Sequence, residues 1–134
     1  MGTVKGCPFC DLDPDRVLFT NRIATALYDA YPVTPGHMLV IPNVHVSSIF
    51  ELSWPKRQAM MDMVELVRDH LGREYKTNCF NIGINEGVWS GQTVDHAHIH
   101  IIPRYKGDVP DPKGGIRWIF PDKAAYWEKT NDSE

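Results

Sequence analysis

Three histidines alternate with apolar residues in the run His-Ala-His-Ile-His-Ile-Ile that begins at residue 96. Side chains of a β-strand alternate between its two faces, so His96, His98 and His100 are expected on one face and Ala97, Ile99 and Ile101 on the other. Imidazole loses its charge near neutral pH, so a neutral ring could attack a phosphorus atom while charged rings hold anionic oxygens. Phosphoryl or nucleotidyl transfer and metal binding both fit this pattern. The alternative is a surface strand that is polar on its outer side.

Two of the three cysteines, Cys7 and Cys10, are separated by two residues. An odd number of cysteines and this close spacing argue against a disulfide framework. Two cysteines at this spacing supply half of a tetrahedral zinc site, which histidines would have to complete. The alternative is a pair of free thiols. Cys79 lies in a predicted strand and is interpreted as a small core residue.

The elements that must position these residues are indicated by apolar periodicity and turn residues. Strands are predicted at residues 17–20, 23–28, 37–41, 79–85 and 96–103. A helix is predicted after the third strand, because Ser53 can cap it and Pro55 suits its first turn. Its apolar stripe recurs at helical spacing in Met60, Met63, Val64, Val67 and Leu71. Strands grouped around one major helix, without regular alternation of strand and helix, predict an antiparallel α+β domain.

The chain has 134 residues, the size of one compact domain, and 43% of them are hydrophobic. A net charge of -3 with neutral histidines gives no basic field for a nucleic-acid backbone, so any phosphate partner should be small and locally bound. No apolar run approaches the roughly 20 residues that span a bilayer, and the first residues lack the charged and apolar regions of a signal peptide. We therefore expect a soluble, cytoplasmic protein without a membrane or nucleic-acid partner.

The sequence around the histidine run extends the pattern on both sides. Gly-Gln-Thr-Val lies just upstream at residues 91–94, Pro-Arg follows at residues 103–104, and Pro-Gly-His occupies residues 35–37. With the complete run of alternating histidines, residues 7–104 resemble the histidine triad (HIT) family. The resemblance implies one α+β HIT domain over residues 1–134, with an antiparallel sheet of about five strands, one long helix and a short helix. It also implies a twofold homodimer whose sheet continues across both chains.

The resemblance assigns His98, the middle histidine, as the nucleophile that attacks the α-phosphorus of a nucleoside phosphate and forms a covalent nucleotidyl-histidine. Water would then release the nucleoside monophosphate. The backbone carbonyl of His96 would orient the His98 ring, and His100 and His37 correspond to the family's phosphate-contacting histidines. Backbone N–H groups that should approach the phosphates lie near Gly91, Gln92 and Thr93. The alternative for this segment is an ordinary turn between strands.

Nucleoside recognition is assigned by the same resemblance. Asp29 stands where family members carry an Asp or Asn that binds the ribose hydroxyls. Leu27 and Leu39 would project toward the base from neighbouring strands, although buried leucines more often belong to a core. Asn85 occupies the position of a glutamine that contacts the phosphate bridge in fragile histidine triad hydrolases.

The cysteine pair fits a metal site found in part of the family. Some histidine triad proteins, and the related galactose-1-phosphate uridylyltransferases, bind zinc with two cysteines, a middle histidine and the first histidine of the motif. The matching residues here are Cys7, Cys10, His45 and His96. The resemblance therefore implies a structural zinc that closes an N-terminal segment, residues 1–15, over the sheet. No organic cofactor is expected.

Residues 100–108 resemble the fragile histidine triad and related dinucleoside polyphosphate hydrolases more than the nucleoside phosphoramidase branch, which usually has glycines after the motif. A hydrolase of dinucleoside polyphosphates is therefore predicted. Arg104, Lys106, Lys113 and Arg117 could attend the distal phosphates or be solvated loop charges. A nucleoside phosphoramidase, a dinucleoside polyphosphate phosphorylase, a nucleotide-binding or interaction module with little catalysis, and a catalytic metal site formed by the histidines are the alternatives.

Residues 105–134 are predicted to form an irregular loop and tail, because Pro and Gly crowd residues 107–115. The aromatic residues of this segment are Trp118, Phe120, Tyr126 and Trp127. They could cover the site, pack on the sheet or complete a partner subunit.

Overall fold

The computed structural model describes residues 3–128 and divides after Arg104 into two compact units. The larger unit holds a five-stranded sheet and a long helix, and the smaller unit holds short helical turns. Residues 1–2 of the predicted segment 1–15, and residues 129–134 of the predicted tail, lie outside the described residues. The single domain predicted over the whole chain stays a prediction. Between residues 3 and 128, no helix combines the length and the apolar character needed to cross a membrane.

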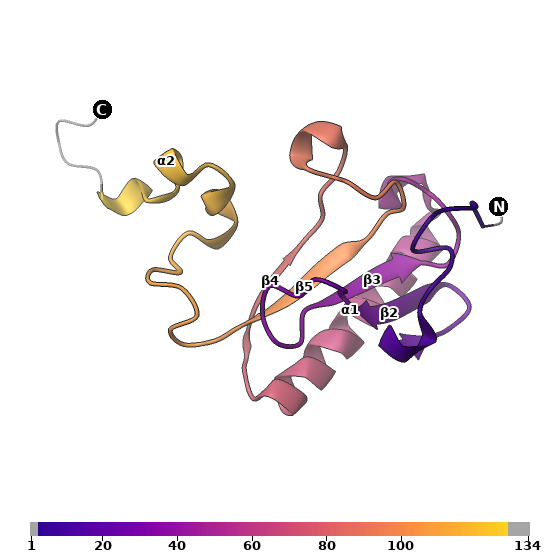
Figure 1. Cartoon of the computed structure of the whole chain (residues 1–134), viewed down its shortest axis with the longest axis horizontal. Coiled ribbons are helices and arrows are strands. Elements are labelled where there is room, and N and C mark those ends of the chain that lie inside the picture. Colours follow the sequence, from indigo (N-terminus) through magenta and orange to yellow (C-terminus); the bar gives the residue numbers. More distant parts are fainter. Residues whose placement is uncertain (1–2, 129–134) are drawn as a thin grey trace. The chain divides into compact units, whose positions relative to one another are not determined.

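The sheet joins its strands in the order β1-β2-β3-β5-β4, and every neighbouring pair is antiparallel (Figure 1). The strands are β1 (Val17–Thr20), β2 (Ala24–Tyr28), β3 (Met38–Pro42), β4 (Cys79–Gly83) and β5 (Ile99–Arg104). Asn21 closes the turn between β1 and β2, because its side-chain oxygen accepts from the N–H groups of Ile23 and Ala24 at 2.8 and 2.9 Å. The predicted α+β class with an antiparallel sheet is confirmed.

The histidine strand is shorter than predicted, since β5 begins at Ile99 and not at His96. The segment before it pairs with a loop instead of a strand, because the Ala97 N–H donates to the Val46 carbonyl oxygen at 2.7 Å. His96 and His98 therefore lie just ahead of β5.

Other predicted strand ends also differ from the observed ones by one or two residues. The second strand begins at Ala24, one residue after Ile23. The third strand begins at Met38, one residue after His37.

The fourth strand ends at Gly83, two residues before Asn85. Gly83 pairs with His100, the second residue of β5. A β4 that reached Asn85 would therefore extend beyond the start of β5, where it has no strand residues to pair with. The first residue of β4, Cys79, is exposed, so the prediction that it belongs to the core is wrong.

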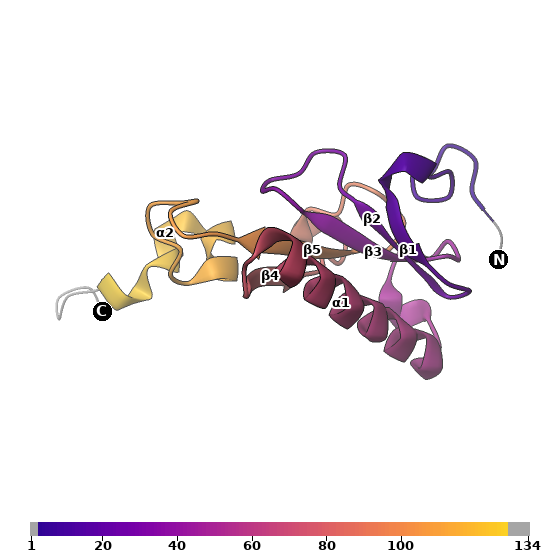
Figure 2. The same cartoon turned by 90° about the horizontal axis from the view of Figure 1, so that it is seen from below.

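The long helix α1 (Trp54–Tyr75) covers one face of the sheet (Figure 2). Its predicted stripe is confirmed, since the buried residues are Met60, Met63, Val64, Val67 and Leu71. They pack with Ala97 and with sheet residues that include Ala24, Ala26, Met38, Val40, Ile99 and Ile101. Ser53 is the N-cap residue and Pro55 lies in the first turn, as predicted, but the Ser53 side chain makes no capping hydrogen bond.

The opposite face of the sheet carries a smaller apolar cluster. Its buried members are Leu27, Leu39 and Ile41, and Phe9, Leu12 and Val17 pack against them. Leu27 pairs with Leu39, and Leu39 pairs with His100. Directly paired residues share a face of the sheet, so His100 lies on this side, away from α1. Ala97, Ile99 and Ile101 of the histidine run belong to the core beneath α1, as the alternation predicts.

The smaller unit differs from the irregular tail that we predicted. It contains the 3-10 turn Gly115–Ile119, the short helix α2 (Pro121–Ala124) and the turn Tyr126–Glu128. Arg117 binds the carbonyl oxygens of Lys123 and Ala124 and lies 4.7 Å from the centroid of the Tyr126 ring. Lys113 lies 5.2 Å from the centroid of the Trp127 ring. These contacts order the turns, and they engage two of the cations predicted for distal phosphates.

Candidate active site

The His98 ring is oriented by a backbone carbonyl. Its Nδ1 lies 2.8 Å from the carbonyl oxygen of His96, and the ring is buried. A carbonyl oxygen only accepts hydrogen bonds, so the proton is on Nδ1 and the lone pair of the neutral ring is on Nε2. A neutral ring nitrogen with a free lone pair is the form that attacks phosphorus.

A chain of hydrogen bonds runs from a backbone amide through two histidines. The Val33 N–H donates to His37 Nδ1 at 3.1 Å, so the proton of the neutral His37 ring is on Nε2. His37 Nε2 lies 3.0 Å from His100 Nδ1 and donates to it. The proton of His100 is therefore on Nε2, where the ring offers a hydrogen-bond donor.

Both of these rings are neutral at pH 7. Burial lowers the pKa of His37 below 6.5, although the carboxylate of Asp29 opposes this shift. Burial, followed by the neighbouring His98 and His37 rings, lowers the pKa of His100 to about 4. We expected charged rings to hold phosphate oxygens, and the structure instead offers the neutral N–H of His100. His37 is only 3% exposed, and it donates to Nδ1 of His100, the ring nitrogen that does not carry this proton.

Asp29 lies beside this pair of histidines. Its Oδ2 is 3.4 Å from His37 Nε2, and its Oδ1 accepts from the Tyr31 N–H at 2.8 Å. The possible ligand atoms of Asp29, His37 and His100 lie within 4.8 Å of one another. In this hydrogen-bonded arrangement, however, His37 has no free lone pair for a metal, because Nδ1 accepts and Nε2 carries the proton.

The four predicted zinc ligands converge from separate parts of the chain. Their ligand atoms, on Cys7, Cys10, His45 and His96, all lie within 4.8 Å of one another. Cys7 Sγ is 3.4 Å from His96 Nδ1, and Cys10 Sγ is 3.3 Å from His45 Nδ1. Tetrahedral zinc with bonds of about 2.3 Å to sulfur and about 2.0 Å to nitrogen would place these atoms about 3.5 Å apart. The separations therefore fit a zinc ion.

The protonation of His96 also fits a metal ligand. Its Nε2 lies 2.8 Å from the Pro42 carbonyl oxygen and donates to it, which leaves the lone pair of Nδ1 facing the thiols. Metal-binding histidines usually donate their other ring N–H to such an acceptor. Two thiols and two imidazoles form the donor set of a closed, structural zinc site.

Of the predicted base contacts, Leu39 pairs directly with His100 in the sheet, and Leu27 pairs with Leu39 on the next strand. They are 0% and 3% exposed and belong to the smaller apolar cluster beneath Phe9. In the structure the pair is therefore part of a core, and its contact with a nucleobase stays a prediction.

The predicted phosphate loop is braced by the side chain of Gln92. Its Oε1 accepts from the Gly87 N–H at 2.9 Å, and its Nε2 donates to the carbonyl oxygens of Ser47 and Val94 at 2.9 and 3.0 Å. Gly91 has a φ of 97°, a conformation that favours glycine. Of the residues predicted to bind the nucleotide, the exposed ones are Asn85, Gly91 and Thr93. The brace formed by Gln92 is a role that the sequence did not predict.

Asn81 was also missed by sequence reasoning. It pairs with Ile102, two residues after His100, and so shares the face of the histidines. Its Oδ1 accepts from Arg104 Nη1 at 2.6 Å. The register between the two predicted strands was the signal that could have revealed this pair. Contact of Arg104 with a distal phosphate stays a prediction.

This fold and its histidine cluster match a known family. The profile described as "HIT domain" covers residues 12–107. The chain belongs to the HIT domain family. Membership predicted from the histidine run is thereby confirmed.

Similar HIT proteins carry names of nucleotide hydrolases. A bis(5'-adenosyl)-triphosphatase from Saccharomyces cerevisiae is 31% identical over 116 residues, which are 85% of this chain and 53% of that protein. An asymmetrical bis(5'-nucleosyl)-tetraphosphatase from Schizosaccharomyces pombe is 36% identical over 96 residues, 72% of this chain and 53% of that protein. A diadenosine triphosphate hydrolase from Plasmodium falciparum, crystallised with cyclomarin A, superimposes with a TM-score of 0.71 at 29% identity, covering 75% of this chain and 68% of that chain. The chain spans about half the length of the two yeast proteins.

Proposed function

We propose that this HIT protein hydrolyses a dinucleoside polyphosphate at its α-phosphate, with His98 as the nucleophile. The observation that carries the proposal is the hydrogen bond from His98 Nδ1 to the His96 carbonyl, because it leaves the lone pair on Nε2. The names of the relatives, a bis(5'-adenosyl)-triphosphatase and a bis(5'-nucleosyl)-tetraphosphatase, support this class of substrate.

In the first step, His98 Nε2 attacks the α-phosphorus. A P–N bond forms, the bond from phosphorus to the bridging oxygen breaks, and the leaving nucleoside polyphosphate takes the electron pair. The ring becomes cationic and keeps its Nδ1 proton, which the His96 carbonyl stabilises. The Nε2–H of His100 donates to a phosphate oxygen on which negative charge develops.

In the second step, water attacks the same phosphorus. The P–N bond breaks, its electron pair returns to His98 Nε2, and the proton of the water passes to solvent. The product is a nucleoside monophosphate, and the neutral ring is restored. Dividing the displacement into two steps is the advantage of nucleophilic catalysis.

The remaining contacts of the substrate complete the proposal. Asp29 binds the ribose hydroxyls, Leu27 and Leu39 contact the base, and Asn85 and the amides of residues 91–93 bind phosphate. The pairing of Leu39 with His100 supports a base site next to the reacting phosphate.

Purified protein supplied with diadenosine triphosphate, diadenosine tetraphosphate or adenosine phosphoramidate would test the function, with products separated by chromatography. We expect AMP from the dinucleotides, loss of turnover with retained nucleotide binding in His98→Ala, and no change in His70→Ala. A wild-type protein without turnover, or full turnover in His98→Ala, would contradict the catalytic role. A strong preference for the phosphoramidate would place the protein in the nucleoside phosphoramidase branch. ADP formed only with added phosphate would indicate a phosphorylase.

We also propose that Cys7, Cys10, His45 and His96 hold a structural zinc. The sulfur–nitrogen separations and the Nε2 proton of His96 support this site. Zinc bound there would tie the N-terminal loop to the segment that precedes β5. Elemental analysis should find about one zinc per chain, and less than about one tenth would overturn the proposal.

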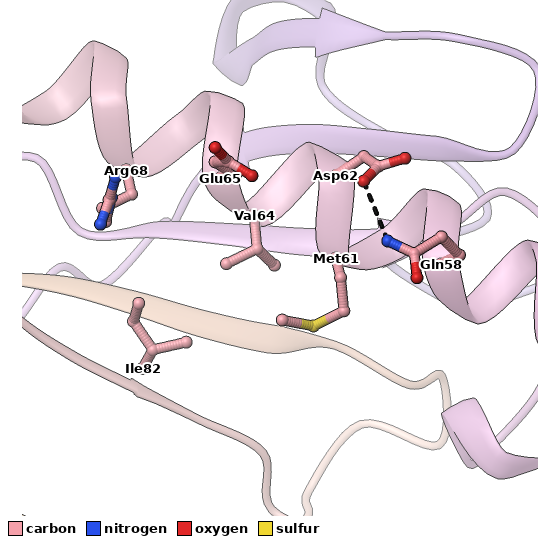
Figure 3. A pocket seen from close by; sticks show the side chains of 7 residues that line it. All are labelled: Gln58, Met61, Asp62, Val64, Glu65, Arg68 and Ile82. Atoms are coloured by element: carbon pink, nitrogen blue, oxygen red, sulfur yellow. Dashed lines mark hydrogen bonds between the residues drawn. The ribbon is translucent and has the colours of Figure 1, made fainter.

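We further propose a twofold homodimer. Within the described residues, β4 is an outer strand of the sheet. Ile82 of β4 and Met61 of α1 are both exposed, and they line one pocket together with Val64 (Figure 3). Pairing β4 with its copy would satisfy the strand edge and cover these side chains. Sedimentation should show a dimer for wild type and a monomer for Ile82→Lys, and a monomeric wild type would contradict the proposal.

A further inference from the structure

The loop that holds both cysteines also brings an aromatic ring to the nucleophile. The centroid of the Phe9 ring lies 5.1 Å from that of His98, with 69° between the ring planes. It also lies 5.8 Å from the centroid of His96, with 86° between the planes. Both are edge-to-face contacts, one of the two favoured geometries for aromatic pairs. One side chain therefore packs against the nucleophile and against the residue whose carbonyl orients it.

The position of Phe9 is determined from both sides. It lies between Cys7 and Cys10, and the N–H groups of Cys10 and Asp11 both lie 3.2 Å from the Cys7 carbonyl oxygen, which closes the loop into a turn. The ring itself packs on the cluster of Leu27, Leu39 and Ile41. The thiol contacts with His45 and His96 anchor this turn above the sheet.

The His98 ring needs such support. Within the described residues, its nitrogens make one hydrogen bond, from Nδ1 to the His96 carbonyl. One hydrogen bond holds that nitrogen in place but leaves the ring plane free to tilt about it, and tilting moves Nε2. The aromatic contacts that oppose this tilt are those of Phe9 and of His100, whose ring centroid is 5.1 Å away.

We infer that Phe9 is a positioning residue for His98, and that the cluster of Cys7, Cys10, His45 and His96 acts on the nucleophile by setting the position of the Phe9 ring. This inference deepens the proposed function and rests on it. Phe9 takes no part in bond making. It keeps Nε2 directed at the phosphorus, and misplacing a reacting atom by about 1 Å can cost about 100-fold in rate.

Phe9→Leu and Phe9→Tyr test the inference, with Phe19→Leu as a matched control. Phe19 also contacts a histidine edge-on, with its ring centroid 5.5 Å from that of His70, but it packs against the core beneath α1. In single-turnover hydrolysis of diadenosine triphosphate at saturation, we expect Phe9→Leu to lower the rate constant about 10- to 100-fold. KM should stay within about twofold, since the substrate still binds. Phe9→Tyr should restore most of the rate, and Phe19→Leu should leave it unchanged.

A second readout does not depend on turnover. Two-bond 1H–15N NMR correlations report the protonation and environment of the His98 ring nitrogens at a fixed pH. Phe9→Leu should perturb the His98 signals, and Cys10→Ser should perturb them in the same direction, whereas Cys79→Ser should not. A raised KM with an unchanged single-turnover rate would make Phe9 a nucleobase contact and overturn the inference. Unchanged His98 signals in Phe9→Leu would overturn it even if wild type proves inactive, an outcome that would refute the proposed function separately.

Discussion

Acidification should destabilise this fold through His100. The pKa of its ring falls from 6.5 to about 4, because the ring is buried beside His98 and His37. As the pH falls, the unfolded chain therefore binds a proton at this position before the folded chain does. The stability that depends on neutral His100 is present above pH 6.5, and it is lost progressively as the pH falls toward 4.

The size of the effect follows from the same shift. The full shift corresponds to about 3 kcal/mol, and linkage places about 2 kcal/mol of this loss of unfolding free energy between pH 7 and pH 5. The His100 side chain is partly exposed, and solvent screening reduces this figure. We therefore expect about 1 kcal/mol from this residue over that range.

Urea unfolding of wild type and His100→Asn, each at pH 7 and pH 5, measures this contribution. Asparagine does not titrate in this range, so the variant should lose about 1 kcal/mol less than wild type on acidification. Burial also lowers the pKa values of His96 and His37. The contribution of His96 is common to both proteins, whereas His37 hydrogen-bonds His100, so the difference between the proteins measures the His37–His100 pair. Equal losses in the two proteins, or a larger loss in the variant, would refute the assignment of a buried, neutral His100.

Three further predictions concern residues around the site. Cys10→Ser should abolish stoichiometric zinc and lower the Tm by more than about 5 °C, whereas Cys79→Ser should leave both unchanged, as measured by elemental analysis and thermal unfolding. Gln92→Ala should lower the unfolding free energy in urea by about 1–2 kcal/mol, because it removes the brace of the phosphate loop, and an unchanged midpoint would contradict that role. Gly36→Ala should cost about 1–3 kcal/mol, because Gly36 has a φ of 87° and an added Cβ would lie 2.8 Å from the ring of the last residue of α1. Gly83→Ala, whose Cβ would meet nothing within 4 Å, is its control in the same urea experiment.

Periodic features were predictable because each depends on neighbouring residues only. The spacing of apolar residues from Met60 to Leu71 identifies the buried side of α1, and the structure buries the same side. Alternation in the histidine run likewise assigns Ile99 and Ile101 to the core beneath that helix. The start of β5 was not predictable in this way. It depends on a long-range contact, because the Ala97 N–H donates to a carbonyl oxygen in a loop and not to a neighbouring strand.

The positions of the protons on His37 and His100 could not be predicted from the sequence, because they depend on a contact between residues that are far apart in the chain. The family resemblance assigned His37 and His100 to phosphate contacts, but it did not indicate that one ring donates to the other. That direction follows from the Val33 amide, which occupies the Nδ1 lone pair of His37. The short turns of the smaller unit were hidden for a similar reason, because Arg117 and Trp127 stabilise a segment whose Pro and Gly content predicts a loop.

His96 links the two parts of the site through three different groups. Its Nδ1 faces the thiols, its Nε2–H donates to the Pro42 carbonyl, and its own carbonyl accepts from His98. The backbone carbonyl survives any substitution at this position, whereas both ring contacts are lost. A defect caused by changing the His96 side chain should therefore reach His98 only by moving the backbone or Phe9. In the proposed mechanism, we expect the first histidine of the run to act through position, while His98 and His100 contact the phosphate itself.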